Sequence, residues 1–179
     1  MEPIPSFIDF EASSLSTDSY PIEVAWNLSD GLIESHLISP EAVIDWTDWD
    51  TESEKIHRIP REELIAHGKP PAWVCERMNE QLKGKTVYSD APRFDGRWLT
   101  KLFSVYENPQ PDFLMGHAYN EISKLLSRAA DGGSFGLINM DALILEARKR
   151  VPGKHRAAWD VGYLVELWKL AYSKSSGMN

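Results

Sequence analysis

Three strand-like runs near the start of the chain constrain its fold more than any other feature. They cover residues 4–11, 21–28 and 32–38, and each is rich in apolar and β-branched side chains. The last two runs are separated by Ser-Asp-Gly at 29–31, and Asp-Gly between two strand-like runs favours a tight hairpin. We therefore expect the chain to open with an antiparallel meander of three strands.

The rest of the chain alternates between helix and strand signals. A polar, acidic connection over residues 39–58 comes first, and a short strand is expected at 85–88. An antiparallel meander followed by parallel strands and helices predicts an α/β fold with a five-stranded mixed sheet flanked by helices. Asp-Gly-Gly-Ser at 131–134 and Pro-Gly at 152–153 mark loops. Helices are expected near residues 60–67, 71–82, 95–106, 117–130, 139–149 and 156–173.

Length and composition limit the class of protein. A chain of 179 residues fits one domain, expected to span 1–179. No apolar run approaches the ~20 residues that span a bilayer, and the N-terminal segment lacks the basic start of a secretory signal. The single cysteine, Cys75, excludes an internal disulfide framework and a multi-cysteine zinc site. These features predict a cytoplasmic protein in which Cys75 is a core residue.

The charge balance argues against a protein that coats nucleic acid. The sequence has 19 Lys and Arg against 27 Asp and Glu, a formal net charge of −8, which opposes broad neutralisation of phosphates. An enzyme that engages a few phosphates through metal ions stays compatible, because some acids would then be metal ligands. The densest basic stretch fits a substrate clamp or a helix C-terminus favoured by the helix dipole. It comprises Arg148, Lys149, Arg150, Lys154 and Arg156.

Asp9 and Glu11 lie in the first predicted strand. Side chains alternate along a strand, so these two point to one face while their apolar neighbours point to the other. Two adjacent carboxylates repel each other and resist burial, and a divalent cation with hard oxygen ligands, Mg²⁺ or Mn²⁺, would resolve the repulsion. The alternative is a solvated strand end, where acids cost little.

Two further segments carry candidate acids. Asp95 stands where the predicted strand at 85–88 gives way to a helix, and it also fits a helix N-cap, while Asp90 fits a turn residue. His155 precedes Asp160 by five residues. The two would share a site best if His155 lies on the loop just before the last helix. The alternative for His155 is an exposed histidine at the start of a helix.

The order of these pieces resembles the DEDDh family of 3′–5′ exonucleases, which have the ribonuclease H-like fold and include proofreading subunits, oligoribonuclease and ribonuclease T. Asp-x-Glu lies on the first strand, Phe-Asp opens a middle helix, and His-x-x-x-x-Asp stands at the last helix. The match runs from Phe7 to about Tyr172. The resemblance implies His155 as general base and two divalent ions, Mg²⁺ or Mn²⁺, held by Asp9, Glu11, Asp95 and Asp160.

The same resemblance implies contacts with the substrate. The Ile-His-x-Ile stretch at 56–59 corresponds to a family segment that lines the pocket of the terminal nucleotide, and the family's Arg-Ala follows His155. Two departures stand out: Ala-Ser-Ser at 12–14 replaces the family's Thr-Thr-Gly, and Ser89 or Asp90 stands where Asn is usual. The substrate contacts implied are Phe10, Ala12, Ser13, Leu15, Ile56, His57, Phe94 and Arg156.

The implied function is removal of nucleoside 5′-monophosphates from a free 3′ end of DNA or RNA. A phosphodiester repels hydroxide, and two metals ~3.5–4 Å apart generate the nucleophile and neutralise the leaving oxygen. Neutral His155, with an ordinary pKa of about 6.5, would accept the proton of the attacking water. The alternative is a catalytically silent nucleic-acid-binding or polymerase-associated module of the same fold. The intact set of four acids and His155 argues against that alternative.

Two further expectations concern assembly and aromatic residues. Stand-alone members of the resembled family are commonly homodimers, so the resemblance extends to a homodimer as a candidate state. Trp46 and Trp49 lie among acids and fit either base stacking or a dimer contact. The alternative is a loop folded back over the core, which the usual burial of tryptophan favours.

Overall fold

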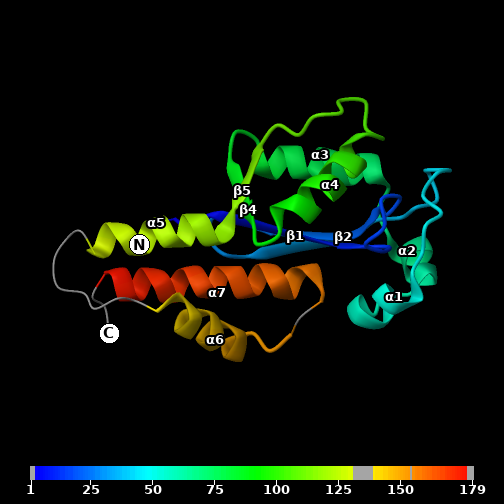
Figure 1. Ribbon diagram of the computed structural model, residues 1–179. Coiled ribbons are helices and arrows are strands. Elements are labelled where there is room, and N and C mark those ends of the chain that lie inside the picture. Colours follow the sequence, from blue (N-terminus) through cyan, green and yellow to red (C-terminus); the bar gives the residue numbers. More distant parts are fainter. Residues whose placement is uncertain (1–2, 131–138, 154, 177–179) are drawn as a thin grey trace.

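One five-stranded sheet forms the centre of the protein (Figure 1). The computed structural model describes residues 3–130, 139–153 and 155–176. The sheet has the order β3-β2-β1-β4-β5; β1, β2 and β3 are antiparallel, and β4 and β5 run parallel to β1. The predicted α/β architecture with a mixed sheet is therefore confirmed. The strands are β1 (Ser6–Ala12), β2 (Pro21–Asn27), β3 (Ile33–Leu37), β4 (Thr86–Ser89) and β5 (Leu114–His117).

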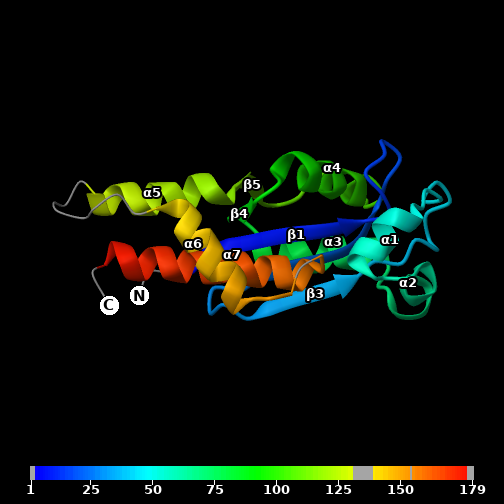
Figure 2. The same cartoon turned by 60° about the horizontal axis from the view of Figure 1, so that its bottom comes forward.

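Helices cover both faces of the sheet. Helices α3 and α4 pack on one face and α5, α6 and α7 on the other, while α1 and α2 lie beyond the carboxyl end of β1 (Figures 1 and 2). Within the described ranges, no helix combines the length and apolar character that a membrane crossing requires. The helices are α1 (Thr51–His57), α2 (Arg61–His67), α3 (Pro71–Leu82), α4 (Pro92–Phe103), α5 (Ala118–Ala130), α6 (Met140–Arg150) and α7 (Ala157–Ser175).

Strand alternation in β1 separates two hydrophobic cores. Ile8 and Phe10 point into the core under α3 and α4, and Phe7 points into the core under α7. Asp9 and Glu11 share the side of Phe7 because successive side chains in a strand point to opposite faces. The acids of β1 therefore face the layer that contains α7.

The start of α4 differs from the sequence prediction. The helix begins at Pro92 rather than at residue 95, because proline fits the first helical turn, where its missing N–H is not needed. Ala91 is the N-cap, and Asp95 lies inside the first turn. The interpretation of Asp95 as an N-cap is therefore wrong, and its carboxylate is available for another role.

Two short elements were not located by the sequence pattern. Helix α1 interrupts the connection predicted over 39–58, and its N-cap Asp50 accepts hydrogen bonds from the backbone N–H groups of Glu52 (3.3 Å) and Ser53 (3.0 Å). The fifth strand, β5, has only four residues, too few to show alternation. The loop predicted at 131–134 lies outside the described residues.

The Trp-rich acidic segment folds back over the core. Trp46 is 1 % exposed and stacks on Tyr20 with ring centroids 5.1 Å apart, which confirms the prediction of a folded-back loop. Trp49 is partly buried against the same core and donates its indole N–H to Glu54 (2.7 Å). Cys75 is also buried in this core, where burial raises the pKa of its thiol to about 12, so the prediction of a core cysteine is confirmed.

Asp48 ties this segment to the loop that follows β1. Its carboxylate accepts hydrogen bonds from the hydroxyls of Ser13 (2.9 Å), Ser14 (2.6 Å) and Ser16 (3.0 Å). Three donors hold the pKa of Asp48 below its ordinary value. The serines that replace the family's Thr-Thr-Gly therefore fix the loop through Asp48.

Candidate metal and nucleotide site

Five carboxylates from four parts of the chain meet at the carboxyl ends of β1 and β4. Asp9 and Glu11 come from β1, and Asp90 follows the last residue of β4. Asp95 and Asp160 lie in the first turns of α4 and α7. The four predicted metal ligands thus come together, and Asp90 joins them.

The carboxylates form two overlapping sets. Ligand oxygens of Asp9, Asp90 and Asp95 lie within 4.8 Å of one another, and so do those of Asp9, Glu11 and Asp160. Asp9 belongs to both sets, as a carboxylate between two neighbouring cations would. The donors are all hard carboxylate oxygens, with no sulfur or imidazole among them, which suits Mg²⁺ or Mn²⁺.

Asp90 is the acid that sequence reasoning assigned to a turn. Its position directly after β4 was the available signal, because β4 runs parallel to β1 and the carboxyl ends of the two strands lie side by side. Side chains that follow the two strands therefore meet at one edge of the sheet. Asp90, one of the two residues in the region where the resembled family usually has Asn, adds a fifth carboxylate there.

Burial raises the pKa of four of these acids. It raises the pKa of Glu11 to about 8 and that of Asp95 to about 7, and it also raises the pKa of Asp90 and, strongly, that of Asp9. Repulsion between the neighbouring carboxylates adds to the effect of burial. Without a cation the cluster therefore retains protons near neutral pH, and a bound cation would displace them.

The acids of β1 have no partners of their own. Asp9 and Glu11 accept no hydrogen bond from any described residue, whereas Asp95 accepts one from the buried hydroxyl of Ser89. The hydroxyl of Ser89 also accepts the backbone N–H of Ala91 (2.9 Å), so this serine orients the carboxylate of Asp95. Oxygens without a donor are what a metal site needs, which supports the fit of a divalent cation.

His155 lies on the loop two residues before α7, as predicted. It has a left-handed backbone with φ of 58°, and its side chain is exposed. Its backbone N–H donates to Oδ2 of Asp160 (2.9 Å). The histidine is therefore tied to the acid cluster through its backbone, while its ring is exposed.

Arg148 holds the other oxygen of Asp160. Its guanidinium donates to Oδ1 of Asp160 (3.1 Å) and lies 3.5 Å from the ring centroid of Tyr163. Arg150 pairs with Glu146 and Glu166. These arginines occupy the last turn of α6 and are engaged by acids, which favours the helix-terminus interpretation over a substrate clamp. Lys154, of the same basic stretch, lies outside the described residues.

Arg156 is bound to a buried acid of β2. Its guanidinium donates to Glu23 at 2.8 Å (Nη2 to Oε1) and 3.1 Å (Nε to Oε2), and the backbone N–H of Ala157 donates to the same carboxylate (2.9 Å). Glu23 is 2 % exposed. The pair joins the N-terminus of α7 to β2, so it fixes the segment that carries His155.

A cavity of about 280 Å³ lies beside Glu11; we call it the Glu11 cavity. Of the predicted substrate contacts, Ala12, Leu15, Ile56 and His57 line it. Sequence reasoning missed other members of its wall, which come from the loop after β1, from α1 and from α4. These are Ser14, Ser53 and Trp98.

The other predicted contacts lie elsewhere. Phe10 is buried in the core on the opposite face of β1, because it alternates with Asp9 and Glu11. Ser13 is fully buried and donates its hydroxyl to Asp48, so it is not free for a substrate. Phe94 is 40 % exposed on α4, next to Trp98 but outside the cavity wall.

His57 has a fixed tautomer. Its Nδ1 accepts the backbone N–H of Ile59 (3.1 Å), so the ring proton lies on Nε2. Burial lowers the pKa of His57, which keeps the ring neutral. Nε2 has no hydrogen-bond partner among the described residues. The ring is 2 % exposed, so this buried donor is unsatisfied.

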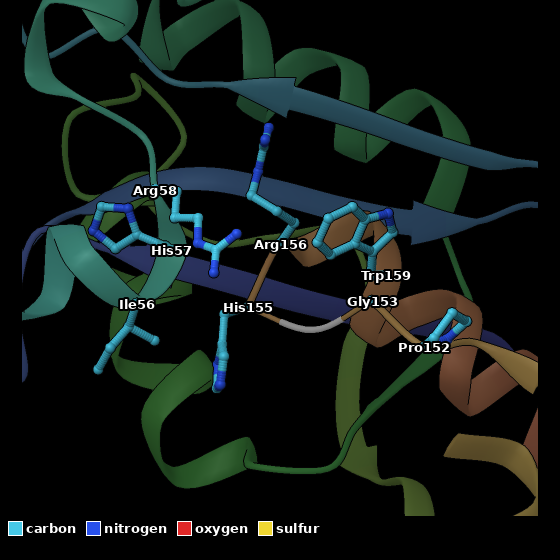
Figure 3. A pocket seen from close by; sticks show the side chains of 8 residues that line it. All are labelled: Ile56, His57, Arg58, Pro152, Gly153, His155, Arg156 and Trp159. Carbon is cyan, nitrogen blue, oxygen red and sulfur yellow. The ribbon is translucent and has the colours of Figure 1, made fainter. Parts of the chain in front are cut away.

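A second cavity, of about 350 Å³, lies on the other side of His155 (Figure 3). Ile56, His57 and His155 line both cavities. We call the second one the Arg58 cavity. Its remaining wall comprises Arg58, Pro152, Gly153, Arg156 and Trp159.

Solved structures of exonuclease I have a similar fold. The structure superposes on E. coli exonuclease I in complex with a dT13 oligonucleotide with a TM-score of 0.61, 18 % identity, and coverage of 97 % of this chain and 42 % of that chain. For the complex with a dA16 oligonucleotide the values are 0.65, 16 %, 95 % and 41 %. The fold is ribonuclease H-like.

A moderately thermophilic exonuclease I from Methylocaldum szegediense gives the same result, with a TM-score of 0.62, 17 % identity, and coverage of 94 % of this chain and 41 % of that chain. The chain thus spans about two fifths of the exonuclease I chains it matches. No family model and no curated protein matches the sequence. At these identities the likeness establishes the fold, and it confirms at that level the resemblance that the motifs predicted.

Proposed function

We propose that this protein is a metal-dependent 3′–5′ exonuclease that releases nucleoside 5′-monophosphates from a free 3′ end of DNA or RNA. The observation that carries the proposal is the pair of carboxylate sets that share Asp9. A single structural acid would need one partner, whereas five carboxylates gathered at one edge of the sheet, four of them with raised pKa values, call for a positively charged ligand.

The acids divide naturally between two cations. Glu11 and Asp160 would hold one with Asp9, while Asp90 and Asp95 would hold the other with the same Asp9. When bound, the cations supply charge neutralisation at the phosphodiester and activation of the attacking water. Because carboxylates bind metal only when deprotonated, their raised pKa values make metal affinity increase with pH.

His155 is the proposed general base. Its ring lies at the wall of the Glu11 cavity, and its backbone is tied to Asp160. The neutral imidazole accepts a proton from the attacking water while the oxygen of that water forms a bond to phosphorus. The bond from phosphorus to the 3′-oxygen of the preceding nucleotide breaks, and the leaving oxygen takes up a proton from solvent, which gives a 5′-monophosphate and a new 3′-hydroxyl.

The Glu11 cavity is the proposed place of the terminal nucleoside. Its exposed apolar walls, Leu15 and Ile56, offer surfaces for a base and a sugar. Exonuclease I neighbours hold dT13 and dA16 oligonucleotides, so single-stranded DNA is the first substrate to test and RNA the second. Contacts to the 2′-hydroxyl would decide between them.

The test is digestion of matched oligonucleotides labelled at the 3′ or the 5′ end, with Mg²⁺ or Mn²⁺. The 3′ label should appear at once as mononucleotide, while the 5′-labelled strand shortens stepwise. A 3′-phosphate should slow the reaction. A covalently closed circle of the same sequence should remain intact, since it has no end. Cutting of the circle would indicate an endonuclease, and binding without hydrolysis would indicate the silent module.

A further inference from the structure

Two non-glycine residues of the described chain have positive φ, and both line the Arg58 cavity. They are Arg58, with φ of 60°, and His155, with φ of 58°. The left-handed conformation is unfavourable for residues with a Cβ and persists where the surroundings or a function require it. Arg58 ends α1 at the position that glycine most often occupies, so a side chain there calls for an explanation.

The guanidinium of Arg58 is free. Its side chain is exposed and makes no hydrogen bond or ion pair with any described residue, whereas Arg156 in the same wall is bound by Glu23. Figure 3 shows Arg58 extending into the space between Ile56, His155 and Arg156. No acid is among the described residues that line this cavity. In a protein of net charge −8, this makes the cavity a local site for an anion.

Trp159 forms the opposite wall. Its indole is 49 % exposed, and the backbone of Gly153 lies so close to it that a Cβ would come within 2.3 Å of the ring. Ile56, 53 % exposed, adds an apolar surface. A held aromatic ring beside a free guanidinium is the combination that binds a base and a phosphate of single-stranded nucleic acid.

We propose that the Arg58 cavity binds a phosphate of the substrate other than the scissile one, with Arg58 on that phosphate and Trp159 stacked on a base beside it. The placement rests on the proposed function, because the cavity shares Ile56, His57 and His155 with the Glu11 cavity. The phosphate is either the next one along the strand or one on the terminal 3′-oxygen.

Calorimetry with three ligands in Mg²⁺ buffer distinguishes these sources. The ligands are a nucleoside 5′-monophosphate, a nucleoside 3′,5′-bisphosphate, and a 5′-phosphorylated dinucleotide with a non-hydrolysable methylenephosphonate linkage. At least one ligand with two phosphates should bind about tenfold or more tightly than the monophosphate, as expected for a charge-assisted contact. The ligand that shows this gain identifies the source of the phosphate.

The gain in affinity should depend on Arg58. In Arg58→Ala the ligand with two phosphates should bind no more tightly than the monophosphate, so that the ratio of these two affinities falls to near one. In Lys85→Ala it should stay at the wild-type value, because Lys85 is an exposed cation that precedes β4, at the end opposite the carboxylates. Trp159→Ala should weaken the dinucleotide about fivefold or more, and Trp159→Phe should recover most of that loss.

Arg58→Gly separates binding from a structural role. Glycine adopts the left-handed conformation without strain, so the melting temperature should stay equal or rise by a few degrees, while the gain in affinity is lost. A gain that survives in Arg58→Gly and Arg58→Ala would overturn the proposal, and so would equal affinity of the wild type for all three ligands.

A substrate with one nucleotide tests the proposed function independently. The p-nitrophenyl ester of a nucleoside 5′-monophosphate should be hydrolysed by the wild type and by Lys85→Ala. If the wild type releases no p-nitrophenol and no mononucleotide from oligonucleotides, the exonuclease proposal fails. An Arg58-dependent gain in affinity measured in the same preparation would still establish the Arg58 cavity as a nucleotide site.

Discussion

Glu11 and Glu23 face each other across the β1–β2 pair, yet the two carboxylates have opposite surroundings. Glu23 receives hydrogen bonds from Arg156, from the backbone of Ala157 and from the hydroxyl of Ser35. Glu11 receives none from the described residues, and burial raises its pKa to about 8. The same strand pair thus contains one carboxylate, Glu23, that is hydrogen-bonded by the protein, and another, Glu11, that no described residue hydrogen-bonds.

The difference indicates what each acid is for. Burying a carboxylate is costly unless hydrogen bonds or a counter-charge replace the lost water. The protein supplies those donors to Glu23, which anchors the N-terminus of α7. No described residue donates a hydrogen bond to Glu11 or Asp9. We therefore expect these two carboxylates to destabilise the metal-free fold and to need a bound cation as counter-charge. We therefore interpret Glu23 as structural and Asp9 and Glu11 as part of the proposed cation site.

The largest expected effect comes from Asp9→Asn. Hydrolysis should fall by on the order of 10⁴-fold or more, because Asp9 belongs to both ligand sets. The metal-free melting temperature should rise, since one of several repelling carboxylates is gone. Activity assays in EDTA and in added Mg²⁺, with calorimetric titration of Mn²⁺, measure the loss of hydrolysis and of metal binding. Thermal unfolding in EDTA measures the metal-free melting temperature.

The matched control is Asp45→Asn, which removes an exposed carboxylate outside the cluster. It should change neither quantity. Undiminished hydrolysis by thoroughly chelated wild-type protein would reject the metal site altogether.

His155→Ala should lower the rate by about 10²–10⁴-fold while leaving metal affinity intact, because the histidine touches the cluster through its backbone. In the wild type the rate should rise with pH as the imidazole loses its proton, and that limb should flatten in the mutant. Exposed His67, mutated to Ala, serves as control. Loss of metal binding along with activity would make His155 a ligand or a support rather than the base.

Glu23→Gln should act on stability in the opposite direction to Asp9→Asn. It removes the counter-charge of Arg156, which is partly exposed, so we expect a loss of about 2–3 kcal/mol in the free energy of unfolding. Urea denaturation of the metal-free protein measures it. Ser35→Ala, which removes a weak donor at 3.3 Å, should cost less than about 0.5 kcal/mol. Wild-type stability in Glu23→Gln would remove the distinction drawn between the two acids.

The smallest effect is a pH dependence of the metal-free fold. The pKa of Glu11 is about 8 in the folded state and about 4.5 when unfolded, so the folded state binds more protons between these values. These values cap the loss of stability at about 3 kcal/mol as pH rises from about 5.5 to about 9, and solvent screening at the partly exposed Glu11 reduces the expected loss to about 1–2 kcal/mol. Saturating Mg²⁺ should reverse the slope and Asp9→Asn should flatten it. A metal-free stability that rises over this range would contradict the raised pKa values.

Much of the fold was predictable because its signals are local. The meander follows from three short runs and an Asp-Gly turn, and the bounds of α3 agree with the predicted 71–82 because Pro71 starts the helix. Helix α4 was misplaced since Pro92 can begin a helix earlier than the apolar pattern shows. Strand β5 was not located because four residues carry too little periodicity, and its pairing with β4 is a tertiary property.

The site was predictable where the order of motifs could be matched, and not where partners come from distant segments. Asp9, Glu11, Asp95 and Asp160 come together as the motif order implied. Nothing local reveals that Arg156 is bound by Glu23, because the partners lie on different elements. The same holds for Ser13 and Asp48. In these contacts two of the predicted substrate contacts, Arg156 and Ser13, bind acids of the protein itself.

The central place of β1 also bears on how the chain folds. Its antiparallel partner β2 is close in sequence and can pair early, whereas its parallel partner β4 and the docking of α7 require the closure of long loops, which is slow. A partly folded chain that holds only the meander carries Asp9 and Glu11 without the other three acids. The full repulsion within the cluster therefore arises only when β4 and α7 join the core, and the proposed cation site is complete only after α7 docks.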